Sequence, residues 1–527
     1  MKRLSILALL LLCCLPLHAQ VSAMRRNAEK IASALFYIQT RYVDSVDFDR
    51  AVDAMMAGLM EQLDPHSTYI PASQVEAANE QLEGSFEGVG IEYVMLYDTL
   101  TIQSVILGGP SDAVGLRAGD KIVAIDGENV AGVGLPAESM KPRLRGPKGS
   151  RVTVTALRDG VARDYVIRRD TIPLESIEAA YEPEPDIVYI KISRFAQQTA
   201  EEFLDSLSHC VKARPKGLII DLRGNGGGFM HVATFLTNLF LGDDQVIVRT
   251  EGKGIDRVDR SRDEGLFEKE PLVILVDEES ASASEIMAGA LQDWDRAVIV
   301  GRRTFGKGLV QQSYNLADGS EMRLTVARYH TPCGRVVQSP YEKGKRDDYY
   351  RQARDRYAHG ESFNADSISF PDSLKYKTLR LGRTVYGGGG IMPDVFVPYD
   401  TTGINRYALR AINGGLLSAF YYDYADKHRK ELAAKDFAAF NARWEKKEKE
   451  VFDEMVAFFE EKGLKAEDED ELAVATPILK TRLKALLARS VLGSTAYWRV
   501  INSEMDPAFQ EGLRIVKNWS GDFPDLP

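Results

Sequence analysis

The sequence is poor in cysteine, which limits how the chain can be stabilised. Only four cysteines occur among 527 residues, and two of them, Cys13 and Cys14, lie within the first twenty positions. The other two, Cys210 and Cys333, are too few to build a disulfide framework in a chain of this length. We therefore expect both thiols to be free and structural, and the fold to depend on a hydrophobic core.

Basic clusters, metal-ligand patterns and long apolar runs are missing as well. The formal net charge is −11, and no block is strongly basic, which argues against nucleic acid or an anionic membrane as the main partner. None of the seven histidines belongs to an H-E-x-x-H motif, so we expect neither a metal nor a cofactor. Beyond the first twenty residues, no stretch approaches the length of a transmembrane helix.

The first twenty residues have the pattern of an export signal. Lys2 and Arg3 form a charged start, residues 4–12 are apolar, and Ala19 offers a small residue for cleavage. Leu12, which precedes Cys13, is too large for a good lipoprotein cleavage site, and this disfavours a lipid anchor. We therefore predict a signal peptide at residues 1–20 and a periplasmic or otherwise exported mature protein.

The strongest signals for chemistry lie in residues 272–311. Residues 272–276 form an apolar run typical of a buried strand, and a helical pattern follows from Ile286 to Trp294. Ser282 lies where the strand gives way to the helix, next to unpaired backbone N–H groups. Further along, Lys307 is flanked by Gly306 and Gly308.

Each of these signals also has a simpler interpretation. Ser282 and Glu285 fit a capping box, in which the serine only satisfies amides at the helix end. The residues G-x-x-x-x-G-K at 301–307 resemble a phosphate-binding P-loop. However, Gly308 stands where Ser or Thr should ligate magnesium, and the residues that follow have an extended pattern instead of a helical one.

Three short motifs in this stretch resemble the carboxyl-terminal processing (tail-specific) serine proteases. They are S-A-S-A-S-E-I at 280–286, Q-D at 292–293 and T-F-G-K-G-L-V-Q at 304–311. The resemblance implies a Ser-Lys dyad with Ser282 as nucleophile, Lys307 as general base and Gln311 as the residue that positions the lysine. A lysine base must be uncharged, so we expect burial to lower the pKa of Lys307 from its ordinary value of about 10.4.

A glycine-rich segment at 224–228 follows an apolar strand pattern at 217–223. Such a run is usually only a turn, but amides at this place can face a cleft. The resemblance assigns the backbone N–H groups of Gly228 and Ala283 to an oxyanion hole, which amide hydrolysis requires. The family more often has N-N-P-G-G here, so the donor glycine can differ by one position within 226–228.

Residues 83–172 resemble a bacterial PDZ domain. The segment G-P-S-D-A-V-G-L-R-A-G-D-K-I-V-A-I-D-G at 109–127 carries the likeness. Such a domain captures a peptide carboxylate at a glycine-rich turn and adds the peptide to a sheet edge. The resemblance places that turn at Gly88, Val89, Gly90 and Ile91. The ligand would be a substrate tail or a regulatory peptide, and the simpler alternative is that these glycines only form turns.

The remaining segments complete a multidomain α/β organisation. We predict an N-terminal helical region at 24–82, with His66 as a turn residue, the PDZ domain at 83–172, a protease core at 173–400 and a helical region at 401–527. Within the core we expect strands at 187–192, 322–329, 335–338 and 390–395, a helix at 199–210 and a surface excursion at 340–385. The acidic run at 467–471 is predicted to be a solvated linker.

The resulting hypothesis is an exported serine endopeptidase that cleaves proteins near their C-termini. Its partners would be proteins or peptides with exposed C-terminal tails, with an adaptor or a second copy of the chain as further possibilities. The alternative is a PDZ-based binding or scaffold protein with an inactive protease core. The C-terminal helices could mediate assembly, cover a cleft or form a plain appendage, and the sequence does not choose among these.

Overall fold

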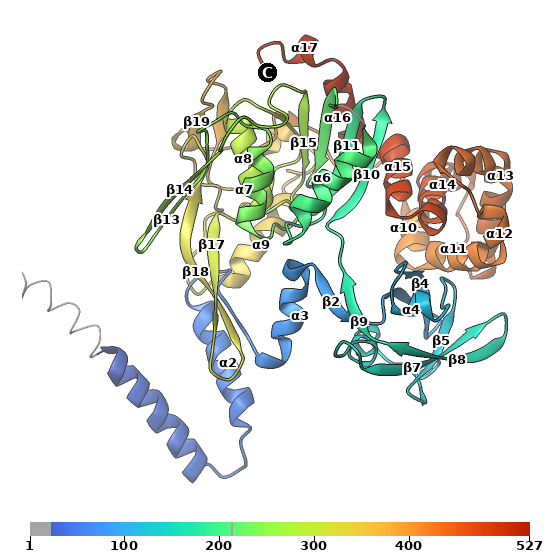
Figure 1. Ribbon diagram of the computed structural model, residues 1–527, viewed down its shortest axis with the longest axis horizontal. Coiled ribbons are helices and arrows are strands. Elements are labelled where there is room, and N and C mark those ends of the chain that lie inside the picture. The colour runs from blue at the N-terminus through green and yellow to red at the C-terminus, as the bar shows by residue number, and fades with distance from the viewer. Residues whose placement is uncertain (1–22, 212–213, 527) are drawn as a thin grey trace, which may run out of the picture.

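A computed structural model describes residues 23–211 and 214–526 (Figure 1). The predicted signal peptide, with Cys13 and Cys14, lies outside the described residues. Within them, no helix combines the length and the apolar character needed to cross a bilayer. Cys210 and Cys333 are free thiols, as expected.

The centre of the molecule is a six-stranded sheet with the order β10-β11-β12-β15-β16-β21. The strands are β10 (Ile177–Glu184), β11 (Ile187–Ile192), β12 (Gly217–Asp221), β15 (Leu272–Val276), β16 (Val298–Gly301) and β21 (Val395–Phe396). All neighbouring pairs are parallel except β10 with β11. β11, β12 and β15 are buried along their whole length, which explains why they are continuous apolar runs in the sequence.

Helices cover both faces of this sheet. The helices α6 (Thr199–Cys210), α7 (Met230–Asn238) and α8 (Ala283–Asp293) pack on one face, against residues such as Ile220 and Ile274. The opposite face is covered by α16 (Pro507–Lys517) and α17 (Trp519–Asp522), against the alternating residues Ile219 and Val273. Successive side chains of a strand point to opposite faces of the sheet, so the residues of one apolar run contribute alternately to two hydrophobic cores.

A second sheet lies beside the first and carries the residues that follow Lys307. Its order is β1-β18-β13-β14, and β17 pairs with β18. The strands are β1 (Thr68–Ile70), β13 (Val246–Gly252), β14 (Ile255–Arg260), β17 (Leu309–Asn315) and β18 (Glu321–His330). Because residues 309–315 are extended, Lys307 does not open a helix as a P-loop lysine does.

The region predicted to be a PDZ domain has its own sheet with the order β3-β4-β5-β7-β8. The strands are β3 (Ile91–Leu96), β4 (Thr99–Val105), β5 (Lys121–Ile125), β7 (Arg151–Arg158) and β8 (Val161–Arg168), and β6 (Glu128–Asn129) pairs with β5. The short helices α4 (Pro110–Ala113), η1 (Ala137–Met140) and α5 (Lys141–Leu144) complete it. Two paired strands connect this unit to its neighbours: β2 (Ser85–Gly88) follows the N-terminal helices, and β9 (Asp170–Pro173) leads to β10 of the central sheet (Figure 1).

The N-terminal part is helical, but its first helix is not packed into the body. Residues 23–41 form a helix that projects away from the rest of the chain, followed by α2 (Phe48–Glu61) and α3 (Ala72–Glu83) (Figure 1). The apolar face predicted for the first helix is exposed, with only Leu35 half-buried.

The C-terminal region is not one appendage. A separate core is formed by α10 (Arg406–Asn413), α11 (Leu416–Lys427), α12 (Arg429–Leu432), α13 (Phe437–Glu461) and α14 (Glu469–Leu492), together with Ala496 and Val500 of the next helix. The chain then returns through α15 (Ser494–Met505) to α16 on the central sheet. The prediction of a linker at 467–471 is wrong, because Asp468 caps α14 and acidic residues 469–471 form its first turn, where the helix dipole favours them.

Three further expectations for the core need correction. Residues 335–338 form no regular strand and make only one bridge, between Val336 and His330. The closing strand is shorter than predicted, since β21 covers Val395–Phe396 alone. Residues 340–385 are more than a surface excursion, because α9 (Arg346–Ala358) packs on the loop that carries Lys307.

Candidate active site

Ser282 lies at the junction between β15 and α8 in a rare backbone conformation. Its φ and ψ are 56° and −112°, outside the regions that a serine normally adopts. Ser282 is also the N-cap of α8, and its N–H donates to the Glu285 carboxylate at 2.8 Å. Strain of this kind is often found where a side chain must be held toward a cleft, so capping and a chemical role are compatible here.

Lys307 lies in the loop between β16 and β17, and its amine has a defined partner. Lys307 Nζ donates to Gln311 Oε1 at 2.8 Å, and Gln311 Nε2 donates to the His66 carbonyl oxygen at 2.5 Å. Within the described residues, Gln311 is the hydrogen-bond partner of this amine, and Ser282 is not. His66 is a turn residue as predicted, but its carbonyl orients the amide that holds the lysine.

A single carboxylate ties the Ser282 segment to the Lys307 loop. Glu285 is fully buried, and its Oε2 accepts the N–H groups of Ser282 and Lys307 at 2.8 and 2.9 Å. Its Oε1 accepts the Thr304 hydroxyl at 2.6 Å and the Gly306 N–H at 2.8 Å. The two segments, more than twenty residues apart in the chain, are thus fixed to the same group.

Tyr329 on β18 makes a second connection between the two segments. Its hydroxyl lies 2.6 Å from the carbonyl oxygen of Lys307 and 3.2 Å from that of Ser282. The ring is buried. The sequence offered no signal for this residue, and Glu285 was recognised only as a capping partner.

Burial changes the charge states in this region. It lowers the pKa of Lys307 below 10.5, although the nearby Glu285 charge acts in the opposite direction. Burial raises the pKa of Glu285 to about 7. The four hydrogen bonds that the carboxylate accepts act in the opposite direction but do not outweigh burial. Burial, with the charge of Lys307, lowers the pKa of His66 to about 4, so its ring is neutral at ordinary pH.

The glycine-rich loop lies directly against Ser282. A Cβ on Gly227 would be 2.8 Å from Cβ of Ser282 and 3.0 Å from the backbone nitrogen of Ala283. The Gly227 N–H already donates to Asn225 Oδ1 at 2.9 Å. In the described part of the chain, the N–H groups of Gly228 and Ala283 have no acceptor, which leaves both available to a ligand.

The predicted peptide-binding turn of the PDZ region, residues 88–91, lies at the junction of β2 and β3. Gly88 ends β2 and Ile91 begins β3, while Gly90 has a φ of 74°, a value that favours glycine. The N–H groups of Val89 and Gly90 have no acceptor among the described residues. β3 is an edge strand of its sheet, so the turn and a free edge lie next to each other.

Among the described residues, no group of three or more His, Cys, Asp or Glu side chains is arranged to hold a metal ion. The arrangement around Ser282 and Lys307 offers a hydroxyl, a buried amine and free amide donors.

Comparisons with known proteins place these features in a family. Residues 186–349 match the model of peptidase family S41, residues 88–167 that of the PDZ domain, and residues 407–493 that of a family of unknown function.

Two relatives from Bacillus subtilis (strain 168) are similar along much of their length. The chain is 34% identical over 345 residues to the carboxy-terminal processing protease CtpA, covering 63% of this chain and 73% of the relative. It is 33% identical over 350 residues to CtpB, covering 64% and 72%. A solved structure of the photosystem II D1 C-terminal processing protease is 25% identical, with a TM-score of 0.35 and coverage of 70% of this chain and 86% of that one.

The resemblance inferred from the motifs and the multidomain α/β class are thus confirmed. The chain belongs to the carboxy-terminal processing proteases of peptidase family S41, and it carries a PDZ domain.

Proposed function

We propose that this protein is an exported endopeptidase that cleaves proteins near their C-termini, with Ser282 as nucleophile and Lys307 as general base. The observation that carries the proposal is the buried Glu285 carboxylate, which binds the backbone N–H groups of both residues. A nucleophile and a base from two separate loops need such a common anchor to keep a reactive geometry.

The mechanism starts from a neutral Lys307. Gln311 Oε1 accepts one hydrogen of the amine, which leaves the nitrogen lone pair for the Ser282 hydroxyl. As Ser282 Oγ attacks the peptide carbonyl carbon, Lys307 takes its proton and then passes it to the leaving amine. Water, activated by the same amine, then hydrolyses the acyl-enzyme.

Attack on the carbonyl places a negative charge on its oxygen, which requires hydrogen-bond donors. We assign this role to the free N–H groups of Gly228 and Ala283, since the Gly227 N–H is occupied by Asn225. This difference excludes Gly227, and the family resemblance is what favours Gly228 over Gly226.

The PDZ domain supplies the preference for C-terminal tails in this proposal. The free amides of Val89 and Gly90 suit a terminal carboxylate, and the open edge of β3 suits an added strand. A peptide competitor with a free C-terminus should therefore inhibit tail cleavage, whereas the same peptide with an amidated C-terminus should inhibit it less.

The direct test is cleavage of a folded protein that carries an unstructured C-terminal tail. We expect Ser282→Ala and Lys307→Ala each to lower kcat by at least about a thousandfold, as losses of a nucleophile or its base do. The exposed Lys253→Ala is the matched control and should keep the parental rate. Mass spectrometry of the products locates the cut.

The scaffold alternative makes the opposite forecast in the same assay. A parent protein that binds the tail but cleaves it no faster than Ser282→Ala would support it. Export is tested separately, because residues 1–20 should be absent from the mature chain recovered from the periplasm, and a full-length N-terminus would contradict it.

A further inference from the structure

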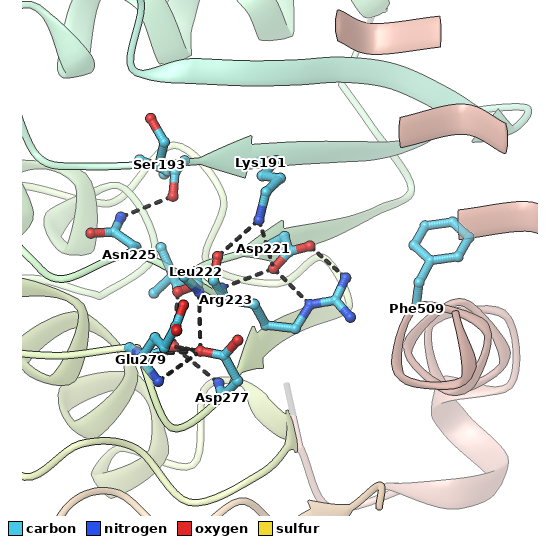
Figure 2. Close-up of polar contacts among 12 residues, drawn as sticks. Lys191, Ser193, Asp221, Leu222, Arg223, Asn225, Asp277, Glu279 and Phe509 are labelled. Atoms are coloured by element: carbon cyan, nitrogen blue, oxygen red, sulfur yellow. Dashed lines mark hydrogen bonds and ion pairs between the residues drawn. The ribbon is translucent and has the colours of Figure 1, made fainter. Parts of the chain in front are cut away.

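Arg223 directly precedes the glycine-rich loop at 224–228, and its guanidinium lies between two carboxylates. Toward Asp221, Nε and Nη2 donate at 2.9 and 2.6 Å. Toward Asp506, Nη1 and Nη2 donate at 2.8 and 2.7 Å. Both pairs are bidentate, which fixes the plane of the guanidinium as well as its position. Figure 2 shows the Arg223 side chain running alongside Asp221.

Lys191 holds the main chain of Arg223. This lysine is only 5% exposed, and its Nζ donates to the Arg223 carbonyl oxygen at 2.8 Å (Figure 2). The same ammonium lies 4.5 Å from the centre of the Trp498 ring and 3.8 Å from an oxygen of Asp221. Trp498 belongs to α15. The C-terminal helices therefore contact Lys191, which holds the Arg223 carbonyl, as well as the Arg223 guanidinium itself.

The cluster is electrically balanced, with two carboxylates and two cations. Burial alone would raise the pKa of Asp221, but the charges of Arg223 and Lys191 outweigh it and hold that pKa well below its usual range. Loss of the Asp506 charge would leave one cation of this buried group without a counter-ion, which is a costly situation.

The loop after Arg223 is firmly attached to the Ser282 segment. The Gly224 N–H donates to Asp277 Oδ1 at 3.0 Å, and the Ala281 N–H donates to the Asn225 carbonyl oxygen at 3.0 Å. Arg223 is the residue through which the chain enters this loop, so its position sets where the loop begins relative to Ser282. Transition-state donors lose much of their effect when displaced by about 1 Å.

We propose that Asp506 is a positioning residue for catalysis: by clamping Arg223 it fixes the loop that presents the Gly228 N–H. Asp506 is the N-cap of α16 and lies outside every segment that matches a family model. The last helices of the chain thus complete the oxyanion hole from behind the sheet. The inference rests on the proposed roles of Ser282 and Gly228.

Asp506→Asn removes the ion pair with Arg223 but keeps the cap of α16. Asparagine is as good an N-cap as aspartate, so α16 keeps its start, while Arg223 loses its second carboxylate. We expect kcat for tail cleavage to fall at least about tenfold with KM within about twofold, because the affected donor acts in the transition state. Labelling of Ser282 by a fluorophosphonate should slow by a similar factor.

Lys517→Ala is the matched control, since it breaks another ion pair of α16, with Glu184 at 2.9 Å, at the opposite end of the helix from Asp506. It should keep the parental kcat and labelling rate. Parental values for a folded Asp506→Asn would overturn the proposal, even if its melting temperature dropped.

If Asp506→Asn fails to fold by circular dichroism, Arg223→Lys decides the question, because it keeps Asp506 as the cap of α16 and replaces the bidentate clamp by a single ammonium. A tenfold loss of the labelling rate supports the proposal, and a parental rate overturns it. A parent protein that is labelled at Ser282 but does not cleave tails would contradict the proposed function, whereas the labelling rates would still decide the role of Asp506.

Discussion

At the scale of single residues, Glu285 is the group on which the site depends. Its carboxylate accepts four hydrogen bonds, and all four partners are donors. A charged carboxylate matches four donors, whereas a protonated one would bring a hydrogen of its own into a group of donors. The pKa of about 7 therefore means that the connection is fully formed only in neutral to alkaline solution.

Glu285→Gln tests this carboxylate in two ways. An amide directs its NH2 group at two donors, so we expect kcat to fall roughly a hundredfold. The Glu285 charge raises the pKa of Lys307, so its removal should move the rising limb of the pH–rate profile to lower pH. The limb rises with pH because the base must lose its proton.

The residual activity of Glu285→Gln is measured as kcat across pH 5 to 10, in steps of about half a unit. The exposed Glu264→Gln serves as a control and should reproduce the parental profile. A limb that stays in place or moves to higher pH would show that Glu285 does not act on Lys307 electrostatically.

At the scale of elements, α9 acts as a brace for the loop that carries Lys307. The Tyr349 hydroxyl lies 3.1 Å from His66 Nε2, 3.1 Å from Gln338 Nε2 and 3.3 Å from the Gly306 carbonyl oxygen. Arg356, on the same helix, donates to the carbonyl oxygens of Arg303 and Thr304, both at 2.9 Å. The helix thus holds the segment before Lys307 and the turn that orients Gln311.

Tyr349→Phe removes the hydroxyl and keeps the packed ring. We expect a loss of about 1 kcal/mol in the free energy of unfolding, typical of a buried hydrogen bond, and a several-fold lower kcat. Tyr357→Phe, at an exposed position of α9, should change neither quantity. Denaturant unfolding and kcat are measured for both variants, and equal values for the two would argue against α9 as a brace.

At the scale of the whole molecule, the projecting helix at 23–41 leaves an apolar seam without a partner among the residues that the structure describes. Met24, Ala28, Ile31, Leu35, Ile38 and Tyr42 recur at alternating spacings of four and three. This repeat is typical of helices that pair in coiled coils. Met24 is 77% exposed and Tyr42 59%, so the seam is available to a second copy of the chain.

We therefore expect the protein to self-associate through this helix. Ile31→Lys combined with Ile38→Lys should convert the oligomer to a monomer, because charges would face each other in the seam. Lys30→Ala, a change to an exposed charged residue of the same helix, should leave the oligomer intact. Sedimentation velocity distinguishes these outcomes, and a parent protein that is monomeric at tens of micromolar would refute the expectation.

Much of the fold followed from local patterns. The predicted strand at 187–192 and the helix at 199–210 have the bounds of β11 and α6. Both patterns can be recognised within one short segment: the strand is a continuous apolar run, and the helix has apolar residues with a period of 3.6. The errors occurred at 335–338 and 467–471. The first segment makes a single bridge to a distant residue, and the second begins a helix through a capping side chain, so hydrophobic periodicity records neither.

The sequence by itself predicted the family, which is confirmed, and singled out Ser282, Lys307 and the glycine-rich loop as candidate site residues, because these signals are short and contiguous. The tertiary structure decided what holds them. Tyr329 reaches Ser282 across 47 positions, and Asp506 reaches Arg223 across 283. Contacts over such separations exist only after the sheet has formed and the last helices have packed behind it, so no local pattern records them.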